Sequence, residues 1–251
     1  MQLHQPLAIA SSRFGASRLS TAGVSSERAA LVQRYELFCD VSAHDCAAVM
    51  AGAHERHFVR RQMLFMAGDP VRQTLLLTSG NVKITQAGQN GSEVILRLNA
   101  AGEPVGAMGL CTRGEHSASA QALDNCTTLA WDATAFETLT DRYPLLRRNM
   151  IRILENRLQE MDARFREIST EKVSARLSSE ILRLVNQVGK RRNGYVSISL
   201  SREELAQLTG TTLFTVSRLL CQWEVQGIVS ARREAVFVHS VQALVDLSKK
   251  E

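Results

Sequence analysis

Proline, aromatic residues and long apolar runs are all scarce in this sequence. Its 251 residues include 4 prolines, and phenylalanine, tyrosine and tryptophan together make up 5% of the chain. No stretch reaches the roughly 18 consecutive apolar residues of a transmembrane helix, and no apolar region follows Met1 as it would in a secretory signal. These absences predict a cytoplasmic protein without a membrane partner.

The cysteine and glycine patterns exclude further classes. The 5 cysteines are an odd number without CxxC spacing, which argues against a disulfide framework and a structural zinc site. The sequence also lacks a glycine-rich phosphate loop and a nucleophile elbow. We therefore expect no metal site, no catalytic residues and no enzyme activity.

Positive charge is concentrated in the last third of the chain. The net charge is +5; residues 171–251 carry twelve Lys and Arg against eight Asp and Glu, whereas residues 1–170 carry eighteen against seventeen. Because neutralising a polyanion releases counterions, this distribution favours a nucleic-acid partner for the C-terminal part. A chain of this length with 45% hydrophobic residues can bury a sizeable core, and we expect two domains.

The clearest local signal lies between residues 201 and 227. Ser201 and Glu204 have the spacing of a capping box, which starts a short helix. Gly210 tolerates positive φ, Thr212 can cap a second helix, and Gly227 can end it. Two short helices joined by a tight turn predict a helix-turn-helix, the motif that places its second helix in a DNA groove.

The second helix has one apolar face and one outward face. At 100° per residue, Phe214 and Arg218 lie opposite the stripe of Val216, Leu220 and Trp223. An outward arginine can bond a guanine edge and an outward phenylalanine can contact a thymine methyl group. The alternative is an ordinary helical hairpin with a solvated arginine. The residues predicted to face DNA are Arg218, Phe214, Ser217, Thr212, Leu213, Thr211 and Arg202.

The flanking segments complete a winged version of this motif. Two β-like runs in residues 228–239, on either side of Arg232-Arg233-Glu234, predict the wing. An amphipathic helix over residues 174–188, a basic turn over residues 189–194 and a strand over residues 195–200 precede the motif.

A period of two marks residues 57–132. Strands are predicted at residues 73–77, 81–85 and 93–98, joined by turns at Ser79-Gly80, Asn90-Gly91 and Ala101-Gly102. Short strands at this spacing indicate a small antiparallel barrel or roll, here placed in a domain of residues 27–145. A helical pattern over residues 27–53, with Ser42 as a cap, precedes it. Residues 1–26 are predicted to be a disordered tail, with a transit peptide as the alternative.

A long helix is predicted from Tyr143-Pro144 onward, with a dimerisation segment at residues 146–170. Its apolar residues recur at intervals of 3 and 4, the pattern of a heptad seam. The seam can pack on the roll of its own subunit or on a second copy. We favour a parallel dimer, since helix-turn-helix proteins commonly present two copies to half-sites one turn apart. The seam residues are Ile151, Leu154, Leu158, Met161, Phe165 and Ile168.

Roll, seam helix and winged helix-turn-helix, in this order, resemble the CRP/FNR family of bacterial transcription regulators over about residues 30–245. The resemblance implies an α+β fold: an antiparallel β-roll of the double-stranded β-helix type, a long dimerisation helix, and a winged helix-turn-helix domain over residues 171–251. It also implies a homodimeric, sequence-specific DNA-binding regulator controlled by an effector or redox signal in the roll. Its partners would be promoter DNA and RNA polymerase.

Residues 102–122 resemble the effector cassette of that family. Cyclic-AMP-binding members place a glutamate after the cassette glycine, for the ribose, and an arginine before a serine, for the phosphate. Here Ala107 follows Gly106, and His116 precedes Ser117, so the ribose acceptor is absent and the phosphate partner is weaker and pH-dependent. A binding module for a cyclic nucleotide or other small ligand, without DNA readout, is the alternative function. The candidate pocket residues are Gly106, Ala107, Met108, His116, Ser117 and Arg113.

Members of this family that sense through an iron–sulfur cluster or a haem need cysteine or histidine ligands at suitable positions. Cys39, Cys46, Cys111 and Cys126 lack the close N-terminal spacing of the family's iron–sulfur ligands. A haem would need an axial ligand from His44, His54, His57 or His116, and roll histidines are more often surface or hydrogen-bonded groups. Cys111 and Cys126 could form a redox pair if they lie close together. We expect no assured cofactor.

The reading helix also departs from the family. Its usual Arg-Glu-Thr-Val-x-Arg is Leu213-Phe214-Thr215-Val216-Ser217-Arg218 here. The glutamate that would accept from cytosine is lost. The half-site is therefore predicted to differ from the TGTGA-like and TTGAT-like elements of relatives.

Overall fold

The computed structural model describes residues 30–89, 91–106 and 114–249. The predicted tail of residues 1–26 lies outside these ranges. So do the pocket candidates Ala107, Met108 and Arg113, and Cys111 of the proposed redox pair. Among the described residues, no helix is long and apolar enough to cross a membrane.

Alternating apolar residues fold the first part of the chain into a roll of antiparallel strands. Within the described residues it has two four-stranded sheets, ordered β1-β8-β3-β6 and β2-β7-β4-β5. The predicted strands at residues 73–77, 81–85 and 93–98 are confirmed as β3, β4 and β5. The strands are β1 (His54–Phe58), β2 (Met63–Phe65), β3 (Gln73–Ser79), β4 (Val82–Ala87), β5 (Glu93–Asn99), β6 (Pro104–Val105), β7 (Ser119–Ala122) and β8 (Cys126–Asp132).

The two faces of β3 serve different cores. Leu75 and Leu77 point into the roll, where both sheets contribute to one apolar cluster. Leu76 points the other way and packs with Trp131 in a second cluster formed with the helices. The period of two therefore produces a filled roll with a helical layer on one side. This layer contains η1 (Glu36–Phe38), α2 (Ala43–Met50), α3 (Ala133–Arg142) and the first half of α4 (Pro144–Thr170).

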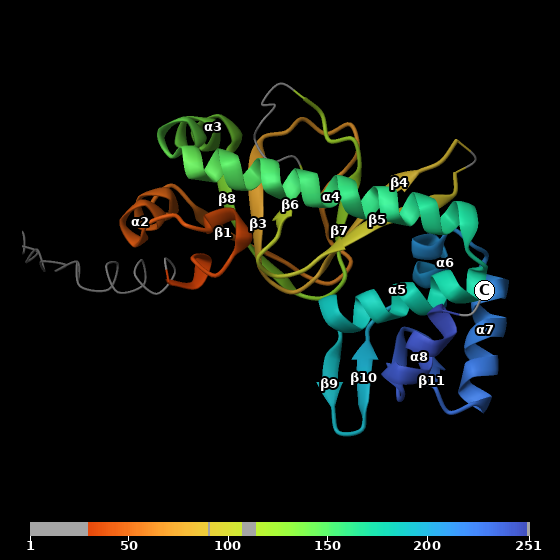
Figure 1. Cartoon of the computed structure of the whole chain (residues 1–251). Coiled ribbons are helices and arrows are strands. Elements are labelled where there is room, and N and C mark those ends of the chain that lie inside the picture. The colour runs from red at the N-terminus through yellow and green to blue at the C-terminus, as the bar shows by residue number, and fades with distance from the viewer. Residues whose placement is uncertain (1–29, 90, 107–113, 250–251) are drawn as a thin grey trace, which may run out of the picture.

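The helix α4 leads from the roll to the C-terminal domain (Figure 1). Its first half is held by Leu146, Met150 and Ile153, which are buried in the helical layer. The Asn149 side-chain amide is also buried and donates to the carbonyl oxygens of Leu37 and Cys39, at 3.0 and 2.8 Å. The end of α4 lies beside α5 and α6.

The C-terminal domain has one apolar core under a four-stranded sheet of order β11-β12-β10-β9. The core is closed by Leu205 from the first helix of the motif and by Leu220 and Trp223 from the second. The elements are α5 (Val173–Gln187), β9 (Lys190–Arg192), β10 (Tyr195–Ile198), α6 (Arg202–Thr209), α7 (Leu213–Val225), β11 (Val229–Arg232), β12 (Ala235–Val238) and α8 (Val241–Ser248).

This domain rests against its own roll. Ile95 and Leu98 of β5 belong to the apolar core of the C-terminal domain, and α6 packs on β5. Charged contacts surround this junction. The Lys83 ammonium lies 3.5 Å from a Glu204 carboxylate oxygen, and the wing residue Glu234 pairs with two arginines of the roll, Arg60 and Arg61.

Two segments differ from their predicted conformation. Lys190–Arg192 is a strand and not a basic turn, because Arg192 pairs with Tyr195 across a turn at Asn193-Gly194. The helical pattern of residues 27–53 is interrupted around Asp40, whose φ of 62° cannot belong to an α-helix. The Ser42 cap predicted for the helix that follows is confirmed, since its hydroxyl accepts from the backbone amide of Asp45.

Candidate nucleic-acid interface and sensor pocket

The turn between α6 and α7 is built as the sequence predicts. The Ser201 hydroxyl accepts from the Glu204 amide at 3.2 Å, and the Glu204 carboxylate accepts from the Ser201 amide at 2.8 Å. Gly210 is left-handed, with φ 60° and ψ 44°, and ends α6. The Thr212 hydroxyl then accepts from the Thr215 amide at 3.2 Å, which starts α7.

The helix α7 buries one face and leaves the other free. Val216, Leu220 and Trp223 are buried, as predicted from their spacing, together with Leu219. Phe214 and Arg218 are exposed, and the relative exposure of Phe214 is 77%. The core of the domain thus fixes the direction of the helix and turns its arginine and phenylalanine outward.

The other predicted contact residues are distributed around this face. Leu213 is 50% exposed at the start of α7, and Ser217 is half-buried beside Arg218. Thr211 and Thr212 lie in the turn, where Thr212 is engaged as the cap. Arg202 is half-buried at the start of α6, separate from the exposed face of α7.

The seam of α4 is uncovered. All six seam residues are exposed: Ile151 by 55%, Leu154 by 43%, Leu158 by 58%, Met161 by 62%, Phe165 by 74% and Ile168 by 51%. The stripe is therefore not buried by its own roll, although Met161, Phe165 and Ile168 border a groove that Val94 and Leu96 of β5 also line. The roll instead contacts an adjacent face, where Arg157 donates to the Pro104 carbonyl and Arg164 to the Leu96 carbonyl, at 2.5 and 2.8 Å.

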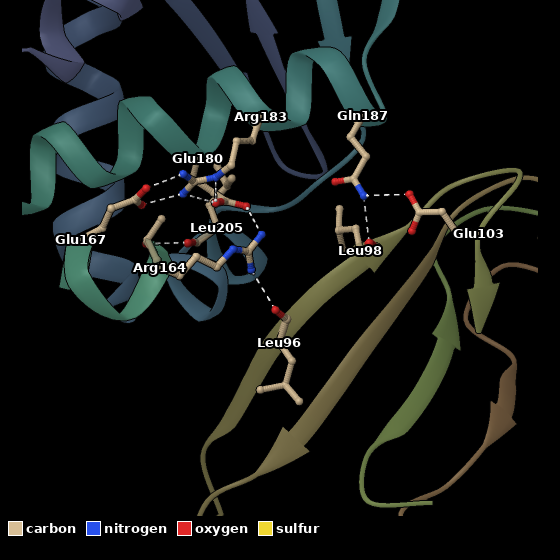
Figure 2. Close-up of polar contacts among 10 residues, drawn as sticks. Leu96, Leu98, Glu103, Arg164, Glu167, Glu180, Arg183, Gln187 and Leu205 are labelled. Carbon is tan, nitrogen blue, oxygen red and sulfur yellow. Dashed lines mark hydrogen bonds and ion pairs between the residues drawn. The ribbon is translucent and has the colours of Figure 1, made fainter. Parts of the chain in front are cut away.

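A charge network joins α4, α5 and β5 at the end of the seam (Figure 2). The Arg183 guanidinium bonds both carboxylate oxygens of Glu167, at 2.7 and 2.9 Å, and also contacts Glu180. The Glu180 side chain is 2% exposed and lies 3.5 Å from Arg164. Since Arg164 also holds the backbone of β5, this network ties the roll to the first helix of the DNA-binding domain.

In the roll, the cassette position before Ser117 holds a histidine that is already packed. The His116 ring is stacked on Phe65, with centroids 3.6 Å apart and planes 11° from parallel. Gly106 lies against this stack at φ 78°, and a Cβ there would come within 2.6 Å of the Phe65 ring. Burial lowers the pKa of His116, although Asp69 partly opposes this. The imidazole is therefore neutral near pH 7, and Ser117 is exposed beside it.

A cavity of about 500 Å³ opens beside this stack. Phe65 and His116 form part of its wall, and Arg56, Gln73 and Asp132 form another part. The Arg56 guanidinium donates one hydrogen bond to the Gln73 side chain, at 2.6 Å, which fixes its position in this wall.

Half-buried positive charge lies between β5 and α4, at Arg97 and Arg157. Burial and the neighbouring Arg157 lower the pKa of Arg97 to about 10, and its Nε has no hydrogen-bond partner. The pKa of Glu103 is raised, chiefly by burial. The sequence analysis did not single out Arg97 or Arg157. The sequence offered one signal for Arg97, which is a charged residue within the otherwise apolar predicted strand of residues 93–98.

Within the residues that the structure describes, the cysteines and histidines do not gather into a site for a metal or a haem. Cys126 is buried in the roll, and burial together with Asp124 raises its pKa to about 11, so its thiol stays protonated. His54 and His57 contact Gln73 and Thr127 respectively, and His44 is exposed on α2. No group of three or more possible metal ligands occurs in residues 30–89, 91–106 and 114–249.

An outward arginine-bearing helix after a tight turn, carried by a domain with a wing, defines a helix-turn-helix DNA-binding protein with a β-roll sensor. Comparison with known families agrees. The model of the cyclic nucleotide-binding domain matches residues 55–143, and that of the Crp-like helix-turn-helix domain matches residues 175–247. The chain belongs to the CRP/FNR family and is a transcription regulator of that type.

Individual relatives support this assignment over most of the chain. The cyclic AMP receptor protein of Thermus thermophilus is 29% identical over 213 residues, which cover 84% of this chain and 96% of the relative. The fumarate and nitrate reduction regulatory protein of Escherichia coli is 25% identical over 191 residues, covering 74% and 75%. The c-di-GMP responsive regulator CLP of Xanthomonas campestris shares the fold: its TM-score is 0.70 at 21% identity, covering 79% of this chain and 100% of that structure.

Proposed function

We propose that this chain works as a homodimer that reads promoter DNA through paired α7 helices. The observation that carries the proposal is the uncovered seam of α4. Six exposed apolar residues at heptad spacing are costly in water, and a second copy of the same stripe buries them. A two-fold dimer then presents two reading helices to half-sites one helical turn apart. Because its target is promoter DNA, the dimer would act in the cytoplasm and contact RNA polymerase there.

At each half-site, Arg218 is the residue proposed to specify a base. It is exposed on the outward face of α7, where a guanidinium can donate two hydrogen bonds to a guanine edge. Ser217 lies beside it, and Thr211, Thr212 and Arg202 lie at the turn or on α6, where they can contact phosphates and fix the register.

The signal is proposed to pass from the roll to the reading helix through the end of α4. A ligand in the roll would shift β5 or α4, and Arg164 contacts the Leu96 carbonyl of β5 and Glu180 of α5. Two arrangements of this contact would place the α7 helices at different separations, which is a coupling between two sites.

The effector is proposed to differ from a cyclic nucleotide bound in the usual way. The cassette has Ala107 where the ribose acceptor belongs, and His116 is neutral and stacked on Phe65. Neither residue can replace the carboxylate or the guanidinium of the cyclic-AMP-binding cassette. No assured cofactor, haem or iron–sulfur cluster is part of the proposal, and the chain is proposed to have no catalytic activity.

The test is a mobility-shift titration of the full chain on duplexes selected from a random pool. Arg218→Ala should weaken specific binding by roughly 1–3 kcal/mol and leave the salt-dependent binding of unselected DNA nearly intact. Gln242→Ala, an exposed neutral change on α8 of the same domain, serves as the control. Equal affinities of wild type and Arg218→Ala for selected duplexes would contradict the role given to Arg218.

The alternative function is a small-ligand binding module without DNA readout. The match of residues 55–143 to the cyclic nucleotide-binding domain favours it. Calorimetry with cyclic AMP and cyclic GMP separates the two functions. If the chain binds either nucleotide tightly and binds no DNA duplex, the binding module is supported. The proposed regulator should instead bind duplexes and give no saturable heat with either nucleotide.

A further inference from the structure

The first turn of α7 exposes apolar side chains where a DNA-reading helix needs contact groups. Phe214 is 77% exposed and Leu213 is 50% exposed, although an apolar core lies directly behind them. The buried stripe of Val216, Leu219 and Leu220 fixes the helix, so neither residue can turn inward. An exposed pair of this kind beside Arg218 forms an apolar patch on the surface that would enter the groove.

This surface carries few polar side chains that can bond to bases. Residues 211–221 contain no Asp, Glu, Asn or Gln. The hydroxyls of Thr212 and Thr215 are engaged in the cap: the Thr212 oxygen accepts from the Thr215 amide, and the two hydroxyl oxygens lie 3.0 Å apart. Cytosine amino groups are read by carboxylates and adenine edges by carboxamides, so α7 has neither of those groups before Gln222. What the N-terminal part of α7, residues 213–218, offers bases is the guanidinium of Arg218, the hydroxyl of Ser217 and the apolar pair.

We propose that Phe214, assisted by Leu213, determines specificity by contacting thymine methyl groups in the major groove. The C5-methyl of thymine is the apolar group that a base pair displays there. The inference rests on the proposed function and names the feature of the operator that this helix prefers, a thymine close to the guanine bound by Arg218.

The helix geometry sets the distance between these two bases. Phe214 and Arg218 are four residues apart, about one turn, so they lie on the same face about 6 Å apart along the axis. Base pairs are spaced 3.4 Å along each strand. The thymine should therefore lie within about two base pairs of the guanine.

The experiment replaces thymine by uracil, which removes the methyl group and keeps the base pairing. Duplexes are first selected from a random pool by the full chain, and each thymine of the selected half-site is then exchanged for uracil. We expect the dissociation constant to rise about fourfold for each methyl that Phe214 or Leu213 covers, the equivalent of about 0.8 kcal/mol per buried carbon. Thymines elsewhere in the duplex are internal controls.

Two variants connect this effect to the named residues. In Phe214→Ala, thymine and uracil duplexes should bind equally at the position that Phe214 covers, whereas Arg218→Ala should keep the uracil effect while binding more weakly. Because Phe214 is exposed, its alanine variant should unfold at the wild-type temperature, which thermal unfolding verifies. The double-mutant comparison isolates the contact from general losses.

The outcomes separate this inference from the function on which it rests. Selected duplexes that bind equally well with uracil, or a uracil effect that persists in Phe214→Ala, overturn the methyl contact while DNA binding stands. If the chain retains no duplex from the pool, the proposed function itself fails and the inference fails with it.

Discussion

The reading helix and the sensor roll of this protein depend on sequence in different ways. The outward face of α7 is set by neighbours within one turn: the caps at Ser201 and Thr212, the left-handed Gly210 and the buried stripe. The sensor pocket is set by residues that meet only in the fold, since Phe65, Gly106 and His116 come from separate segments. Local patterns therefore set the proposed DNA-binding face, whereas the candidate effector pocket depends on tertiary packing.

The largest expected effect tests whether the reading helix works alone. Leu158→Lys places a charge in the centre of the exposed seam, where a dimer would bury it. We expect a monomer in sedimentation and at least about a 100-fold loss of affinity for selected duplexes, because two linked half-site contacts bind far more tightly than one. Gln159→Lys, next to it but off the seam, is the matched control. A dimeric Leu158→Lys protein with normal DNA affinity would show that the seam is not the interface.

The next effect concerns the junction between the two regions. Glu180→Ala removes a carboxylate that is 2% exposed and takes from Arg164 its ion-pair partner, while Arg183 keeps Glu167. An unpaired Arg164 charge at this site should cost about 2–4 kcal/mol of unfolding free energy, less than at a fully buried site because the Arg164 side chain is 23% exposed. Asp141→Ala, which breaks the exposed pair with Arg147, should cost less than about 1 kcal/mol. Equal losses in the two variants, measured by denaturant unfolding, would show that burial of this network is unimportant.

Helix caps allow a like-for-like comparison of the two regions. Ser201→Ala removes half of the capping box of α6, and Ser42→Ala removes the cap of α2 in the roll. Each should cost about 1 kcal/mol of stability. Only Ser201→Ala should also weaken DNA binding, because α6 fixes the turn that starts α7. A DNA-binding defect in Ser42→Ala would contradict this separation.

The smallest effect is a pH dependence in the roll. Burial lowers the pKa of His116 from its ordinary 6.5, so the unfolded chain takes up this proton first as the pH falls. The contribution of His116 to stability is therefore complete above pH 6.5 and declines as the pH falls below it. Unfolding free energies of wild type minus His116→Gln, measured from pH 8 to pH 5, should decrease toward acid. A difference independent of pH would mean that the histidine is not desolvated.

Hydrophobic periodicity in the sequence predicted the fold, and helix-capping residues predicted the position of α7. The strands β3, β4 and β5, the capping box, Gly210 and the buried stripe of α7 follow from spacing and local chemistry. The sequence analysis did not predict the Phe65–His116 stack or the half-buried Arg97 and Arg157, because pairing across the roll and against α4 decides those contacts. It also read Lys190–Arg192 as a turn, since three basic residues carry no strand signal until β10 pairs with them.

The central claim is that two chains, joined along α4, hold one duplex with two α7 helices. Its most direct test is the stoichiometry of the complex between the full chain and a selected duplex, measured by sedimentation. The account predicts two chains per duplex, with two protected tracts one helical turn apart. A single chain per duplex, or a stable monomer that leaves every duplex unbound, would contradict it.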